Sequence, residues 1–160
     1  MTIRKAGNTD YEAIWEIFSK VIATGDTYVF SPNTPKTSLQ KYWLAENMDT
    51  FIALENEEVI GTYFIKPNQV DLGSHIANCG YMIHPKHHSK GFGRQLCEHS
   101  IKYAKEKGYF GIQFNVVVST NTNAVALWQK CGFSIIGTTP KGFRHPTLGL
   151  VDTYIMFREV

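Results

Sequence analysis

The sequence predicts an α/β (α+β) fold in which one sheet carries helices on both faces. Segments with the apolar spacing of strands alternate along the chain with segments that have the three- and four-residue spacing of helices. The run at residues 110–119 is almost continuously apolar, which is typical of a strand covered on both faces. With 160 residues, the chain is expected to form a single domain over residues 1–160.

The first half of the chain is predicted to contain two helices and four strands. Thr9 or Asp10 can cap the first helix, whose apolar positions 13, 14, 17, 18 and 21 form one face, and Gly25 ends it. A second, short helix is expected to begin near Thr37. The strands are expected at residues 2–5, 50–54, 58–65 and 75–84, and a tight Glu-Asn-Glu turn makes the middle two a hairpin.

The second half is predicted to contain two more helices and three more strands. Small or apolar residues at positions 93, 96, 97, 100, 101 and 104 form the stripe of a helix that Gly108 ends. Another helix is expected over residues 124–131, before Gly132, and the strands at 110–119, 134–139 and 151–158. Residues 140–149 are long for a hairpin connection and rich in Gly, Pro and Lys, so we expect a loop over a site.

The segment from Asn78 to Arg94 combines a buried strand, a polar glycine-bearing loop and the start of a helix. Pro85 stops the strand, and Gly91 and Gly93 introduce the helix. Unpaired backbone N–H groups and the positive end of the helix dipole make such a loop a site for an anion, most often a phosphate. The alternative is a tight crossover that needs glycine only for packing. The loop lacks the Gly-Lys-Ser/Thr ending of P-loop nucleotide enzymes, which excludes that class.

Composition and charge narrow the function classes further. The net charge of +2 is too small, and the Lys and Arg residues are too scattered, to indicate a nucleic-acid partner. The sequence has no signal peptide or membrane-length apolar run, so we expect a cytoplasmic protein with no membrane partner. The three cysteines, Cys79, Cys97 and Cys131, are expected to be buried free thiols in a reducing compartment.

Two motifs in the right order resemble those of the GCN5-related N-acetyltransferases, the GNAT superfamily. Gly91-Phe92-Gly93 follows His88 as in the family's Gln/Arg-x-x-Gly-x-Gly/Ala motif, after a strand that ends Tyr-Met-Ile-His-Pro. Residues 121–133, Asn-Thr-Asn-Ala-Val-Ala-Leu-Trp-Gln-Lys-Cys-Gly-Phe, are similar to its second signature. The resemblance covers nearly the whole chain. It implies the GNAT fold, a single mixed and mostly antiparallel sheet of about seven strands, with helices on both faces and splayed central strands.

The resemblance implies acetyl-coenzyme A (acetyl-CoA) as a co-substrate. Backbone amides of residues 88–94 would hold its pyrophosphate, although His88 departs from the family's Gln or Arg. Main-chain groups of Met82 and Ile83 would pair with the pantetheine arm, and a nearby backbone N–H would polarise the thioester carbonyl. Asn121 would cap the next helix and contact the pantetheine, and Trp128 would pack on this arm or fill core. The residues expected to bind the cofactor are Met82, Ile83, His88, Ser89, Lys90, Gly91, Phe92, Gly93, Arg94, Asn121 and Trp128.

The chemistry implied by the resemblance is direct attack of a neutral amine on the thioester in a ternary complex. Keeping an amine of pKa about 10.4 neutral at pH 7 costs about 4.6 kcal/mol. Asn78 stands where many family members have Glu, and an amide cannot take a proton, so Asn78 is expected to orient the substrate. The proton acceptor is left open among water, bulk solvent, His75, Asp71 and Asp152. Trp128 replaces the family's tyrosine acid, but an unprotonated thiolate leaving group costs only about 2 kcal/mol.

A narrower resemblance concerns the acceptor. Residues 61–68, Asn78 and residues 114–121 resemble fungal acetyltransferases that act on proline analogues such as azetidine-2-carboxylate, and residues 24–30 are similar to a loop of phosphinothricin-type amino-acid acetyltransferases. Both imply a small amine that carries a carboxylate. Asn115, expected to be buried among apolar residues, would either bind this substrate catalytically, with Asn78, or bond across the splayed strands. Candidate walls of the acceptor pocket, or else core residues, are Tyr28, Phe30 and Tyr63.

Several alternatives remain open from the sequence. His84, His87 and His88 suggest a metal site, but Pro85 interrupts their spacing and no carboxylate or cysteine lies nearby, so no metal is expected. A non-catalytic acyl-CoA sensor would be consistent with the missing Glu and Tyr. A protein N-acetyltransferase would need an acidic or open groove, for which the sequence gives no sign. The resemblance alone suggests a homodimer.

Overall fold

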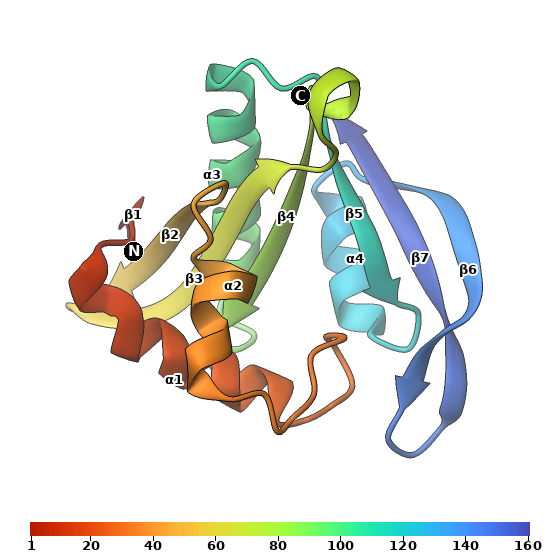
Figure 1. Ribbon diagram of the computed structural model, residues 1–160, viewed down its shortest axis with the longest axis horizontal. Helices are drawn as coiled ribbons and strands as arrows, with labels where there is room; N and C mark the ends of the chain where they lie inside the picture. Colours follow the sequence, from red (N-terminus) through yellow and green to blue (C-terminus); the bar gives the residue numbers. More distant parts are fainter.

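The computed structural model describes residues 1–160 and contains one seven-stranded sheet with helices on both faces (Figure 1). The strand order is β1-β2-β3-β4-β5-β7-β6. Neighbouring strands are antiparallel throughout, except for the parallel pair β4 and β5. The predicted mixed, mostly antiparallel sheet is therefore confirmed. None of the helices combines the length and the apolar character needed to cross a bilayer.

Each predicted helix and strand is present, with shifts at the ends. The strands are β1 Thr2–Lys5, β2 Asp49–Glu55, β3 Glu58–Pro67, β4 Ile76–Ile83, β5 Gly111–Val118, β6 Ser134–His145 and β7 Gly149–Glu159. The helices are α1 Tyr11–Ile22, α2 Leu39–Trp43, α3 Phe92–Glu106 and α4 Thr122–Lys130.

Two apolar cores hold the layers together, one on each face of the sheet. The apolar faces of α1 and α2 pack with Phe64 and Met82, and Trp43 donates its indole N–H to Thr62 Oγ1 at 3.0 Å. On the other face, α3 packs through Leu96 and its neighbours against residues that include Tyr63. Successive residues of β3 therefore pack into opposite cores, because side chains alternate between the two faces of a strand.

The expectation of a loop at residues 140–149 is wrong. β6 continues to His145 and pairs with β7 from Gly149 onward, so the segment is a long hairpin. A register shift between Thr139 and Phe143 absorbs the extra residues, and Lys141 takes a φ of 52° while its N–H bonds Asp152 Oδ1 at 2.9 Å. The prolines and glycines therefore mark a bulged edge strand. Proline is tolerated in such a strand because the N–H that it lacks is not needed to pair with a further strand.

The feature that positions the site is the separation of β4 from β5. The two strands pair only at Ile76 with Gly111 and at Ala77 with Ile112, and they diverge from there (Figure 1). Val116 is 46% exposed, contrary to the expectation that both faces of this strand are covered. It lies between Phe114 and Val117, where the β5–β7 register shifts. The predicted splay of the central strands is confirmed.

Gly80 lies on β4 beside this gap but makes no bulge. The β3–β4 register runs without a shift through the pair Phe64 and Gly80. A Cβ at Gly80 would lie 2.6 Å from Phe64 Cε1 and 3.2 Å from Trp43 Cη2. Glycine is therefore required here because two aromatic rings occupy the space of a side chain.

Candidate active site

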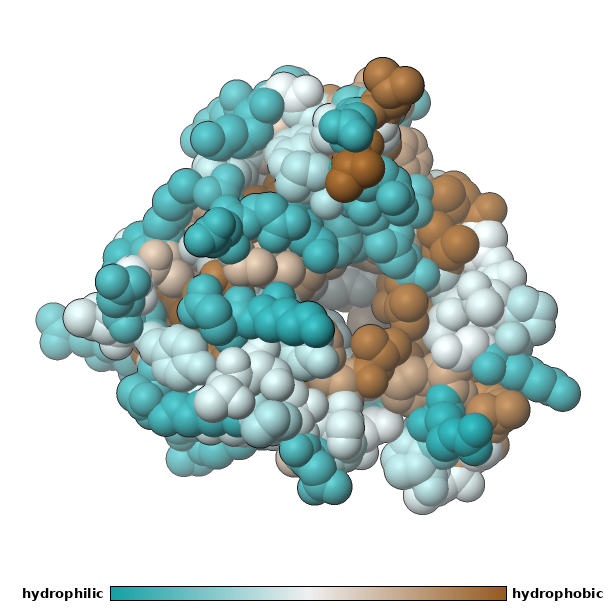
Figure 2. All heavy atoms as spheres, viewed as in Figure 1, coloured by the Kyte–Doolittle hydropathy of each residue, from teal (hydrophilic) through white to brown (hydrophobic).

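Three neighbouring hollows lie where β4 and β5 part, and all three are lined by Thr27 and Tyr28 of the α1–α2 connection. The largest, about 500 Å³, extends along β4 to the start of α3 and is bounded by α4. A hollow of about 130 Å³ lies in the gap itself, and one of about 170 Å³ is lined by β3, β4 and β5. The space-filling view shows this face of the molecule hollowed near its middle (Figure 2).

The glycine-bearing loop presents backbone N–H groups at one end of the largest hollow. Ser89 and Gly91 adopt the left-handed region with φ of 63° and 78°, and no side chain caps the start of α3 at Gly91. Alternation of this kind forms a concave nest of N–H groups that binds anions. Arg94 pairs with Glu98 at 2.7 Å, and Lys90 is exposed beside the loop. The local geometry therefore fits a diphosphate.

The two glycines of the motif have different roles. A Cβ at Gly91 would meet nothing within 4 Å, so its conformation and the open space in front of it account for the glycine. A Cβ at Gly93 would lie 3.2 Å from Leu127 Cδ2, so this glycine lets α3 pack against α4. Ligand approach and helix packing, the two interpretations of the motif, thus apply to one glycine each.

Two side chains cover the edge of β4 that faces the gap. The Tyr28 hydroxyl donates to the backbone carbonyl of Tyr81 at 2.6 Å and accepts from its N–H at 2.9 Å. The His88 ring donates from Nε2 to the carbonyl of Ile83 at 3.1 Å. Met82 buries its side chain in the α1–α2 core and is one of the residues that line the largest hollow. The polar groups of β4 that lack a strand partner therefore point into the groove.

Two polar atoms beside this edge have no partner at all. Asp26 Oδ1 and Thr27 Oγ1 are buried and make no hydrogen bond. Buried polar atoms without partners are rare in folded proteins, and both residues line the largest hollow. Such atoms fit a groove built to receive a polar ligand. Both residues lie in the 24–30 segment, but its pattern does not mark these two side chains, because Gly-Asp-Thr in a loop is also typical of an ordinary turn.

The start of α4 closes the groove with two residues of the second motif. Asn121 caps the helix, with Oδ1 accepting from the Ala124 N–H at 3.3 Å, and it lines two of the hollows. Its side-chain amide N–H groups remain available to a ligand. Trp128 lines the same two hollows and packs on Tyr81 and Phe114, with ring centroids 4.9 and 5.1 Å away. It therefore fills core and forms a wall of the groove.

The smaller hollow beside β3 carries the two asparagines. Asn78 donates from Nδ2 to the carbonyl of Gln113 at 2.9 Å, across the gap, while its Oδ1 has no protein partner. Asn115 is exposed, which corrects the expectation of burial, and it bonds Asn68 Oδ1 at 2.7 Å and Gln113 Nε2 at 3.0 Å. Both asparagines line this hollow, and no charged side chain does.

Of the three aromatic residues considered as candidate pocket walls, two line the hollow beside β3. These are Tyr28 and Phe30, which stack on one another at 5.9 Å. Tyr63 is 0% exposed, stacks on Phe51 at 4.8 Å and bonds His99 Nδ1 through its hydroxyl at 2.7 Å. As a pocket wall it is therefore a wrong prediction, because strand alternation places Tyr63 on the α3 face and its neighbour Phe64 on the pocket side.

Titratable groups near the gap are few. Burial raises the pKa of Cys79 to about 12, so this thiol stays protonated and is a poor nucleophile, although it lines two hollows. The proton acceptors considered from the sequence, His75, Asp71 and Asp152, line none of the three hollows. None of these three side chains is therefore placed to take a proton at the gap.

The histidines that follow β4 each contact another group of the protein, and they do not converge on one position that a metal ion could occupy. His84 is buried, with Nε2 3.0 Å from Lys20 Nζ, and burial together with this lysine lowers its pKa. His87 lies 3.4 Å from a carboxylate oxygen of Glu58. No group of three or more His, Cys, Asp or Glu side chains is placed to hold a metal ion.

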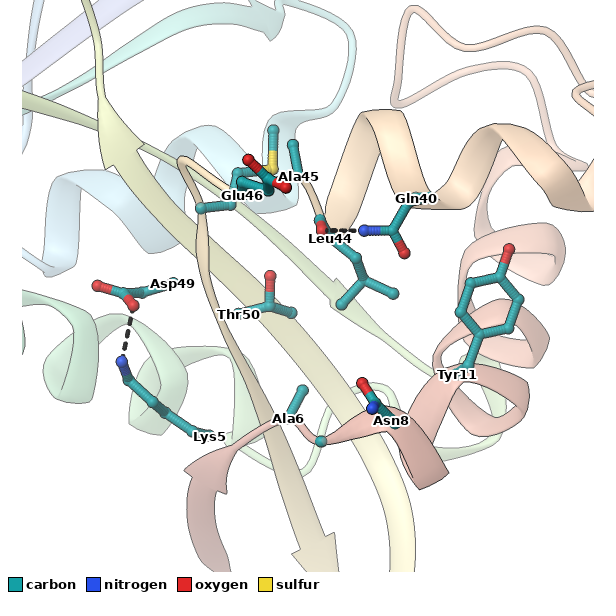
Figure 3. A pocket seen from close by; sticks show the side chains of 12 residues that line it. Lys5, Ala6, Asn8, Tyr11, Gln40, Leu44, Ala45, Glu46, Asp49 and Thr50 are labelled. Carbon is teal, nitrogen blue, oxygen red and sulfur yellow. Dashed lines mark hydrogen bonds and ion pairs between the residues drawn. The ribbon is translucent and has the colours of Figure 1, made fainter.

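A separate hollow of about 460 Å³ lies between the start of α1 and the α2–β2 connection (Figure 3). Three of its polar side chains already have partners, since Lys5 contacts Asp49 at 2.7 Å and Gln40 bonds the carbonyl of Leu44. It shares no residue with the three hollows at the gap. We therefore place the active site at the gap.

Comparison with known proteins agrees with this geometry. The profile of the "Acetyltransferase (GNAT) family" matches residues 11–133. N-acetyltransferase aca1 of Schizosaccharomyces pombe is 36% identical over 100 residues, which are 61% of this chain and 47% of that protein, so the match spans about half of its length.

Two solved structures are also similar. A GCN5-related N-acetyltransferase from Kribbella flavida superposes with a TM-score of 0.94 at 35% identity, over 99% of this chain and 97% of that one. The structure of yncA from Salmonella typhimurium with its cofactor acetyl-CoA has a TM-score of 0.86 at 22% identity, over 99% and 93%, which shows the common fold. The chain belongs to the acetyltransferase (GNAT) family, whose enzymes use acetyl-CoA as a co-substrate.

Proposed function

We propose that this chain is an acetyl-CoA-dependent N-acetyltransferase whose acceptor is the amine of a small molecule, an amino acid or an amino-acid analogue. The observation that carries the proposal is a row of neighbouring hollows with shared walls. They extend from the uncapped start of α3, along the unpaired edge of β4, to a small uncharged hollow at the gap. Their length and polarity fit a diphosphate, a pantetheine arm and an acceptor, in that order.

The cofactor would be held largely by main-chain groups. The amides of residues 89–94 face the diphosphate position, and the β4 edge at Ile83 offers strand-type pairing to the amides of the arm. Asn121, Asp26 and Thr27 supply polar atoms along the same groove. Acetyl-CoA supplies the acyl group as a thioester, and the chain's own residues orient it.

The acceptor hollow favours a small, polar amine over a peptide. A volume of about 170 Å³ suits a molecule of amino-acid size, and its walls combine aromatic rings with two asparagines. Lys66 neighbours two residues that line it, with Nζ 5.8 Å from the centre of the Phe64 ring and its backbone opposite Asn78 in the β3–β4 register. Lys66 makes no ion pair with the protein, so it is free to bind a substrate carboxylate.

The reaction follows from these positions. The amine nitrogen attacks the thioester carbon, a C–N bond forms, and the carbonyl electron pair moves to oxygen. When the carbonyl reforms, the C–S bond breaks and the thiolate leaves with its electron pair, while the amine proton passes to water. Asn78 Oδ1 accepts from the amine N–H and so aims its lone pair. No acyl-enzyme is required, because the Cys79 thiol remains protonated.

Titration calorimetry with acetyl-CoA, followed by thiol release with a panel of amino acids and proline analogues, tests the proposal. We expect binding of acetyl-CoA and release of free CoA with at least one carboxylate-bearing amine. Binding without thiol release across the panel would instead identify an acyl-CoA sensor. Acetylated peptides, found by mass spectrometry, would identify a protein N-acetyltransferase. No binding of acetyl-CoA would overturn the proposal.

Lys66→Gln is expected to raise the KM for a carboxylate-bearing acceptor about tenfold, which corresponds to about 1.4 kcal/mol. The kcat and the KM for acetyl-CoA should stay unchanged, because Lys66 would contact the carboxylate of the acceptor and neither its reacting amine nor acetyl-CoA. Lys41→Gln is the matched control, since Lys41 also lies over an aromatic ring, that of Tyr42, at 5.6 Å. An equal loss with the same amine lacking its carboxylate would rule out this role for Lys66.

A further inference from the structure

Tyr28 occupies an unusual position on β4. Its hydroxyl accepts from the Tyr81 N–H at 2.9 Å and donates to the carbonyl of the same residue at 2.6 Å. Inside a sheet these two groups would pair with the next strand, but β5 has already separated from β4 at this point. One phenol oxygen therefore takes the place of a missing strand neighbour in the middle of the proposed active site.

The phenol ring is held firmly by other aromatic rings. It stacks on Phe30 at 5.9 Å and meets the edge of Trp43 at 6.0 Å. Burial raises the pKa of the Tyr28 hydroxyl far above its ordinary value, so the group keeps its proton at any working pH. Tyr28 can therefore act as a hydrogen-bond donor, and it cannot act as a base.

Acetyl transfer at this gap requires donors for a carbonyl oxygen that becomes negatively charged. The Tyr81 N–H points into the gap, as its hydrogen bond to Tyr28 shows. The Tyr28 O–H lies next to this N–H, so one bound oxygen could accept from both donors. Before the cofactor arrives, these two donors are engaged with one another and with the Tyr81 carbonyl. A thioester oxygen placed within reach of the Tyr81 N–H would also lie within reach of the phenol.

We propose that the Tyr28 hydroxyl is a catalytic group that exchanges partners when acetyl-CoA binds, an inference that rests on the proposed function. The Tyr81 N–H passes from the phenol oxygen to the thioester oxygen, and the Tyr28 O–H turns from the Tyr81 carbonyl to that same oxygen. The two groups then form an oxyanion hole. The released Tyr81 carbonyl faces the gap, where it accepts from an N–H of the attacking amine.

The exchange balances without any further reactant. As the amine forms its C–N bond, the carbonyl electron pair moves to the oxygen held by Tyr28 and Tyr81. As that pair returns, the C–S bond breaks and the thiolate leaves. Tyr28 keeps its proton throughout. In the resting protein the same hydroxyl shields a strand edge that would otherwise be open to water or to another chain.

Tyr28→Phe tests the proposal because it keeps the ring and removes the hydroxyl. We expect kcat to fall about 100-fold, as for the loss of one oxyanion-hole donor. The affinity for free CoA, which has no thioester carbonyl, should stay within about twofold of the parent value, a change of under about 0.5 kcal/mol. Tyr42→Phe is the matched control, since this neighbouring ring packs on Phe30 at 4.8 Å and its hydroxyl makes no bond within the protein.

Infrared spectroscopy of bound acetyl-CoA, labelled with ¹³C at the carbonyl, gives a readout that a purely structural role would not change. The carbonyl band should lie at lower frequency on the parent protein than in solution, and it should return toward the solution value in Tyr28→Phe. If that variant unfolds, 3-fluorotyrosine at position 28, a stronger donor of the same shape, should lower the band further. An unchanged band with kcat within threefold would overturn the role of Tyr28, whereas a failure to bind acetyl-CoA would overturn the proposed function itself.

Discussion

Gly91→Val is expected to weaken acetyl-CoA binding more than 100-fold, or about 2.7 kcal/mol, and to leave the fold intact. Gly91 has a φ of 78°, which a β-branched residue strongly disfavours, and the space in front of it is open. A valine would pull the loop out of this conformation and place its methyl groups where the diphosphate is expected. The nest of N–H groups would then be lost. Titration calorimetry with acetyl-CoA measures the effect.

Gly108→Val is the matched control for this prediction. Gly108 has a φ of 79° and also meets nothing within 4 Å, but it lies just beyond the end of α3, far along the helix from the glycine loop. Both variants should lose about 1–2 kcal/mol in the free energy of unfolding, because both strain the backbone in the same way. Equal cofactor affinity of the two variants would contradict an anion site at Gly91.

Gly80→Val is expected to lower the free energy of unfolding by about 1–3 kcal/mol, as overpacking of a core does. The new Cβ would lie 2.6 Å from Phe64 Cε1 in the middle of a central strand, where neither strand can shift without disturbing its neighbours. For a chain of this size, the melting temperature should fall by roughly 3–10 °C. Urea and thermal unfolding, followed by circular dichroism, measure the change.

Gly137→Val on β6 is the control, because its Cβ would meet Ile155 Cδ1 at an ordinary 3.6 Å. This variant should be neutral or slightly stabilising, since valine favours strands more than glycine does. Phe64→Leu should restore part of the stability lost in Gly80→Val. If Gly80→Val is as stable as the parent and loses only acceptor binding, ligand approach and not ring packing explains the glycine.

Periodicity and the two motifs predicted the elements, the splayed sheet and the loop that presents its N–H groups. They could not predict which face of β3 lines the hollow at the gap, because both of its faces are buried and apolar residues occupy both. For this reason the pattern does not decide between a pocket wall and a core position for Tyr63. Nor does it mark the register shift between Phe114 and Val117, the stretch in which Asn115 is exposed.

Contacts between distant segments account for the remaining difference. The hydroxyl of Tyr28 meets a backbone 53 residues further along the chain, and no local pattern marks such a pair. The unpartnered oxygens of Asp26 and Thr27 are likewise visible only when the folded surroundings are known. The segment 140–149 was predicted as a loop because Gly and Pro also mark bulges in edge strands, which spacing alone does not distinguish from turns.

A crystal structure with bound CoA tests the central claim most directly. It should show the diphosphate on the backbone amides of residues 89–94 and the sulfur between β4 and β5, beside Tyr28 and Tyr81. A CoA molecule seated in the hollow between α1 and α2 (Figure 3), or a groove that stays closed by the Tyr28–Tyr81 bonds at saturating CoA, would contradict it.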